Sequence, residues 1–155
     1  MVPEDELNRI YKQALLIGML MLVGLPVVLA LVAVFAASGG WEPAPNRAAN
    51  KFMFLMVGLV ALAEPFMALI IQKIQIAGYR KNTGTKMTVG KFVLNREIIR
   101  FSFVNSVFVL GLVVFLVSRE LSYMLYFYIY GLIWAVIYRP RREKIKTLMK
   151  SLEKS

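Results

Sequence analysis

Glu64 is the acidic residue whose position most needs a chemical explanation, because it lies inside a long apolar stretch. Taking residues 52–72 as a membrane-spanning helix places Glu64 roughly 3 Å from the bilayer centre, at about 1.5 Å per residue. A charged, unpaired acid costs several kcal/mol there, so such residues usually face the interior of a helix bundle. Ala61 and Ala68 share a helical face with Glu64, and small residues allow a neighbouring helix to approach. We therefore expect a buried, neutral carboxyl.

Further polar side chains are expected at the same depth in two other apolar stretches. Ser102, Asn105 and Ser106 form one helical stripe, and Tyr130 lies near the middle of the last stretch. Together with Glu64 they form a candidate proton or ion site, because oxygen ligands of this kind suit a hard cation such as Na⁺. The alternative is structural: a protonated carboxyl hydrogen-bonded to an amide joins two helices and contributes about 1 kcal/mol or less.

Two prolines interrupt consecutive apolar stretches at matching depth. Pro26 and Pro65 each lack the backbone N–H that would bind the carbonyl four residues earlier, which frees the oxygens of Leu22 and Ala61. In transporters, interrupted helices near the midplane often supply carbonyls to coupling ions. Proline is also commoner in membrane helices than in soluble ones, so the alternative is that both are helix-kink positions without a further function.

The sequence offers little for enzyme chemistry. Its 155 residues contain no cysteine and no histidine, which excludes disulfides, Cys/His metal sites and catalytic thiols or imidazoles. Asp5 is the one aspartate and lies outside the apolar stretches, and Glu64 is the one carboxylate within them, so these stretches hold no pair of carboxylates. Without a paired acid and base or an evident nucleophile, we expect no catalytic residue, no metal site and no cofactor.

The elements that carry these residues are four apolar stretches, at 14–37, 52–72, 98–117 and 121–138. Each is close to the roughly 20 residues that a membrane-spanning helix requires. The composition agrees, with 59% hydrophobic residues and a mean hydropathy of +0.63. None of the stretches shows the apolar–polar alternation of a membrane β-strand. The predicted fold class is an all-α integral membrane protein, in which four transmembrane helices form an antiparallel bundle and residues 1–155 make a single domain.

The distribution of basic residues predicts the orientation of these helices. Of the 19 Lys and Arg residues, 16 lie before the first span, around the 73–97 connection or in the tail, and three lie in the other two connections. Because positive charge gathers on the cytoplasmic side, both termini are expected in the cytoplasm. Arg100, near the start of the third span, is expected to extend toward cytoplasmic lipid phosphate rather than toward Glu64.

The tail, residues 139–155, combines basic residues with an apolar face at Ile145, Leu148, Met149 and Leu152. We expect a basic amphipathic helix on an anionic inner leaflet, where each nearby Lys or Arg contributes about 1 kcal/mol. Docking to a cytoplasmic partner or to RNA is the alternative, but positive charge on the cytoplasmic side already accounts for the basic residues, so no nucleic-acid partner is expected. The candidate headgroup-binding residues are Arg139, Arg141, Arg142, Lys144, Lys146 and Lys150.

Two functions are compatible with these features. The first is a structural, accessory or assembly subunit of a larger membrane complex, favoured by the small size and the broad apolar faces. The second is an oligomeric transporter or channel component in which Glu64 binds a proton or cation. Both need partners in the bilayer, either further copies of the chain or other membrane subunits. The expected location is a cell membrane, as a multi-pass protein of a bacterial or archaeal plasma membrane.

Overall fold

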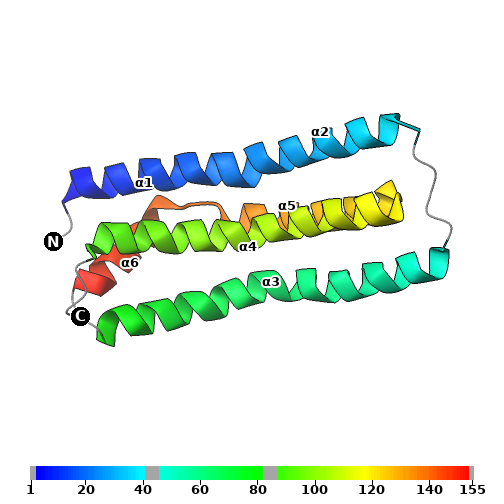
Figure 1. The fold of residues 1–155 in the computed structure, drawn as a ribbon. Coiled ribbons are helices and arrows are strands. Elements are labelled where there is room, and N and C mark those ends of the chain that lie inside the picture. Colours follow the sequence, from blue (N-terminus) through cyan, green and yellow to red (C-terminus); the bar gives the residue numbers. More distant parts are fainter. Residues whose placement is uncertain (1–2, 41–45, 82–86, 154–155) are drawn as a thin grey trace.

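The computed structural model describes residues 3–40, 46–81 and 87–153, and helices are its only regular elements over these ranges (Figure 1). Four of its helical stretches are long and apolar enough to cross a membrane, which makes the chain a multi-pass membrane protein by length and composition. The helices are α1 (Glu4–Met19), the π-helical segment η1 (Leu20–Gly24), α2 (Leu25–Ser38), α3 (Arg47–Lys81), α4 (Val89–Ser118), α5 (Leu121–Tyr138) and α6 (Arg142–Glu153).

The helices extend well beyond the apolar stretches that predict them. The first begins at Glu4 rather than near residue 14, and α3 continues to Lys81, so most of the predicted 73–97 connection is helical. Thr88 starts α4, because its side-chain oxygen accepts a hydrogen bond from the Lys91 amide at 3.4 Å. Hydropathy marks the residues that suit hydrocarbon, whereas polar residues outside it can still continue a helix. The predicted ranges 14–37, 52–72 and 98–117 therefore mark apolar segments within longer helices, whereas 121–138 coincides with α5.

The first long helix accommodates Pro26 through a change of helical pitch. The amide of Leu25 donates to the carbonyl of Leu20, five residues earlier, which defines the π-helical segment η1 immediately before the proline. A π-helical turn shifts the hydrogen-bond register beside the proline, which has no N–H to donate, and such turns often occur at functional positions. As a result, α1, η1 and α2 follow one another as a continuous rod (Figure 1).

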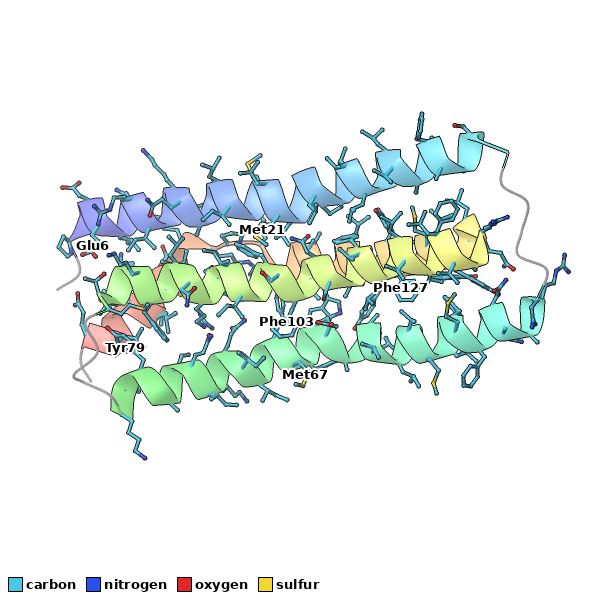
Figure 2. All side chains as sticks on the ribbon, viewed as in Figure 1. Glu6, Met21, Met67, Tyr79, Phe103 and Phe127 are labelled. Carbon is cyan, nitrogen blue, oxygen red and sulfur yellow. The ribbon has the colours of Figure 1, made fainter. Side chains whose placement is uncertain are left out.

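Helix α4 is the centre of the molecule. It contacts α1, η1, α2, α3, α5 and α6. Of the 18-residue segment of each helix that is apolar enough to span a membrane, 56% is buried in α4 and 17% in α3. Figure 1 shows α4 between the α1–α2 rod and α3, with α5 alongside it. Figure 2 shows Met67 on the side of α3 that faces away from α4, where apolar side chains are exposed. The outer helices therefore present broad apolar surfaces around one buried helix.

The two chain ends lie at the same end of the molecule, because α6 packs against α1 and α4 (Figure 1). Arg142 of α6 reaches Glu4 at 3.1 Å and Asn8 at 2.9 Å, both in α1. The predicted tail helix is confirmed, but its apolar face is used inside the protein. Buried residues of α1, α4 and α6 form one cluster there, made of Leu7, Ile10, Ala14, Phe92, Val93, Ile145, Met149 and Leu152.

Candidate functional site

The sequence predicted that Glu64 is buried, but in the structure it is only half-buried in α3. The face of α3 that packs on α4 follows Ala61, Pro65 and Ala68, and Glu64 lies at the edge of this face. Among the described residues, no hydrogen bond or ion pair reaches its carboxyl. Residues 3–40, 46–81 and 87–153 thus supply no partner for an acid in a membrane-length helix.

The other predicted members of the midplane site are not joined to Glu64 by hydrogen bonds. Asn105 is buried in α4, and both polar atoms of its amide lack a partner in the part of the chain that the structure describes. Tyr130 donates from its hydroxyl to the carbonyl of Leu62 at 3.1 Å. Ser102 and Ser106 bind carbonyls of their own helix, at 3.0 Å and 2.7 Å. Among the described residues, no hydrogen bond therefore joins the predicted members into one site, and Ser102 is exposed on α4.

The prolines are instead tied to tyrosines of α5. The Tyr138 hydroxyl donates to the carbonyl of Pro65 at 2.8 Å, and the Tyr128 hydroxyl donates to the carbonyl of Pro26 at 3.3 Å. The two interrupted helices are thereby fixed to the same neighbour. That the carbonyl oxygens of Leu22 and Ala61 are free to bind a ligand stays a prediction.

Tyr138→Phe tests this attachment. We expect the free energy of unfolding to fall by about 1 kcal/mol, because the Pro65 carbonyl loses a buried hydroxyl donor while the ring stays in place. Tyr126→Phe is the matched control, since Tyr126 lies on the same helix with an exposed ring. Unfolding in neutral detergent measures both variants, and equal effects would contradict a specific role for the Tyr138 hydroxyl.

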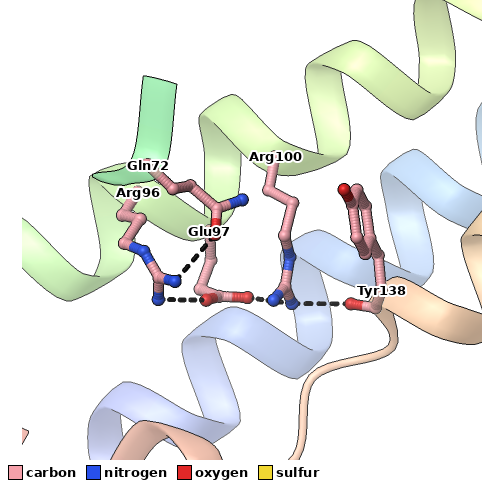
Figure 3. Close-up of polar contacts among 5 residues, drawn as sticks. All are labelled: Gln72, Arg96, Glu97, Arg100 and Tyr138. Atoms are coloured by element: carbon pink, nitrogen blue, oxygen red, sulfur yellow. Dashed lines mark hydrogen bonds and ion pairs between the residues drawn. The ribbon is translucent and has the colours of Figure 1, made fainter. Parts of the chain in front are cut away.

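A second polar cluster lies nearer the end of the molecule that holds both termini (Figure 3). The Arg96 guanidinium donates to the Gln72 side-chain oxygen at 2.7 Å and lies 3.5 Å from the Glu97 carboxylate. Glu97 also pairs with Arg100 on the same helix. Arg100 then donates to the backbone carbonyl of Tyr138 at 2.6 Å. One polar chain therefore connects α3, α4 and the end of α5.

Arg100 lies inside this cluster, so the prediction that it extends to lipid phosphate is wrong. Its guanidinium carbon also lies 5.1 Å from the centre of the Tyr138 ring, within reach of a cation–π contact. A buried carboxylate one turn away and a carbonyl at a helix end offer Arg100 partners within the protein. These partners favour burial over extension to the lipid surface.

Glu97 is the residue that sequence reasoning missed. It was assigned to a connection between spans because it precedes the third apolar stretch, yet it is buried at the centre of the cluster. The available signal was the i, i+3 spacing of Glu97 and Arg100, which places an acid and a base side by side on a helix. That signal becomes useful only when the helix is extended back beyond the apolar stretch.

The cluster forms part of the wall of a cavity of about 640 Å³ between α3, α4, α5 and α6. Its polar wall includes Gln72, Arg96, Glu97 and Arg100, and α6 adds Lys144. The remaining candidate headgroup residues Arg139, Arg141, Arg142, Lys146 and Lys150 are not part of this wall. The structure therefore separates Lys144 from the other basic residues of the tail.

Comparisons with known protein families, with curated proteins and with solved structures find no match for this chain. The residues of the chain itself are the basis for the functions proposed below.

Proposed function

We propose that the chain is an accessory or structural subunit that packs through α3 and α5 against another protein in the membrane. The proposal includes one antiparallel four-helix domain with both termini in the cytoplasm. The 16 basic residues assigned to one side support that orientation, as does the contact between α1 and α6.

Glu64 is the observation that carries this proposal. An acid within an apolar span is costly and is usually paired, yet no described residue of this chain pairs with it. Its edge position on α3 leaves the carboxyl partly accessible from outside the chain. A polar group on a neighbouring subunit satisfies the carboxyl without requiring a cavity in this protein.

An apolar groove that does not include Glu64 gives α3 and α5 a second surface for packing. The groove has a volume of about 470 Å³ and lies between α3 and α5, with Leu59, Leu62 and Tyr126 among its lining residues. Gly58 also lines it, and a Cβ added there would meet no atom within 4 Å. Since small residues allow close helix approach in membranes, the groove suits a helix of a second membrane protein.

A photo-activated cross-linking residue at Leu59 tests the proposal in native membranes. We expect one discrete protein adduct, whereas the same residue at Val34, an exposed position of α2, should give no protein adduct. An adduct of twice 17.6 kDa would identify a second copy as the neighbour. Equal labelling at both positions, or no protein adduct at Leu59, would contradict a packing role for this groove.

Glu64→Gln separates this role from the alternative, a proton- or cation-coupled transporter component. Under the subunit proposal, purified protein in vesicles does not dissipate a pH gradient, and Glu64→Gln retains the Leu59 adduct because glutamine still hydrogen-bonds. Proton flux through the purified protein that Glu64→Gln abolishes would replace the subunit proposal with the transporter one.

A further inference from the structure

The cavity between α3, α4, α5 and α6 has one apolar and one polar side. Leu69, Trp134 and Ile137 line the apolar side, and they belong to the parts of α3 and α5 assigned to the membrane. Arg96, Lys144 and hydroxyl-bearing residues of α6 line the polar side. Its volume of about 640 Å³ lies within the range of about 300–1,000 Å³ that is usual for ligand cavities.

The polar side has more hydrogen-bond donors than acceptors. Nε2 of Gln72, Nε of Arg96 and Nε of Arg100 are buried N–H donors without a partner among the described residues. Gln72 and Arg100 are only 4% and 8% exposed, so bulk water does not supply these groups with hydrogen bonds. Buried donors are rarely left without an acceptor. These three donors, like the Glu97 Oε2 acceptor, have almost no accessible surface, so a ligand in the cavity would reach them only after a shift of the wall, whereas Lys144 is exposed.

The charged residues that line the cavity favour an anion. Arg96, Arg100 and Lys144 bring three positive charges, and Glu97 and Glu143 bring two negative ones. Glu97 is already shared between two guanidinium groups. Lys144 is exposed on α6 and forms no ion pair within 4 Å among the described residues, although it acts on Glu97 through a longer-range Coulombic interaction. One positive charge is therefore left for an anion.

We propose that this cavity binds the phosphate group of an anionic phospholipid, with Arg96 and Lys144 at the phosphate. Arginine and lysine are the usual side chains for phosphate recognition. The acyl chains of the lipid lie against Leu69, Trp134 and Ile137, which a free phosphate ion would leave uncovered. The site is independent of the subunit role proposed for α3, because it lies on different residues.

Binding of a phospholipid in the cavity differs from the general attraction of a basic tail to an anionic membrane. A diffuse attraction depends on the number of basic residues and treats Lys144 and Lys150 alike. The cavity includes Lys144 and does not include Lys150, although both are exposed on α6. These two lysines therefore form a matched pair for an experiment.

Trp134 provides the probe, since it lines the apolar side of the cavity. The chain has two tryptophans, so Trp41→Phe in the full-length protein leaves Trp134 as the single fluorophore. The protein in neutral detergent is titrated with phosphatidylglycerol carrying brominated acyl chains, which quench tryptophan on contact. Phosphatidylcholine with the same chains is the headgroup control, and inorganic phosphate is added as a competitor.

We expect brominated phosphatidylglycerol to quench Trp134 at an about tenfold lower concentration than phosphatidylcholine. Lys144→Gln should weaken phosphatidylglycerol binding about fivefold, the effect of one basic residue near a phosphate, and Lys150→Gln should change it less than about twofold. Equal quenching by the two lipids, or equal effects of the two lysine variants, would overturn the proposal. Complete reversal by inorganic phosphate at the lipid's own concentration would also overturn it and assign the cavity to a free anion.

Discussion

Glu97→Gln is expected to lower the free energy of unfolding by about 3–5 kcal/mol, the usual cost of removing one partner of a buried ion pair. The variant leaves Arg96 and Arg100 close together without the carboxylate that lies against both of them. Glutamine has nearly the same shape, so the loss reflects charge rather than packing. Unfolding in neutral detergent, followed by circular dichroism, measures the effect.

Two further variants show whether the ion pair is responsible. Glu143→Gln removes an exposed acid that lines the same cavity, and it should change stability by less than about 0.5 kcal/mol. Adding Arg100→Met to Glu97→Gln removes one of the two bases that lose the carboxylate, and part of the lost stability should return, because a buried ion pair replaced by apolar groups is often neutral. A Glu97→Gln protein as stable as the parent would contradict a structural role for the cluster.

The four membrane-length helices were predictable because hydrocarbon imposes a simple length and composition rule. Residues 121–138 match α5, whose ends adjoin the short connections 119–120 and 139–141. The same rule failed at the amino-terminal end of α4, since residues such as Arg96 and Glu97 satisfy one another and stay helical. Hydropathy counts each residue alone and cannot register that two charges become acceptable as a pair.

The midplane site illustrates a different limit. Helical spacing placed Glu64, Asn105 and Tyr130 at similar depth, but depth leaves the rotation of each helix undetermined. In the structure Tyr130 turns to the Leu62 carbonyl, and Asn105 is buried without a hydrogen-bonding partner among described residues. Which residues meet depends on the close approach of α4 to its neighbours, and that approach depends on packing of small residues.

Gly111 is a position where this packing is close to its limit. A Cβ added at Gly111 in α4 would lie 2.7 Å from Cβ of Phe127 and 3.5 Å from the carbonyl oxygen of Met124, both in α5. An atom so near the backbone of α5 cannot rotate away as the end of a flexible side chain can. Gly111→Ala is therefore expected to force the two helices apart and to cost about 1–3 kcal/mol, the usual range for overpacking.

Gly58→Ala is the matched control, because a Cβ at Gly58 in α3 would meet no atom within 4 Å. Alanine favours the helix over glycine by about 0.5–1 kcal/mol, so this variant should be neutral or slightly more stable. The same gain applies to Gly111→Ala, so the difference in stability between the two variants measures the contact with α5. If both variants gain stability, α4 and α5 are not in close contact at Gly111, and the central position of α4 would need another cause.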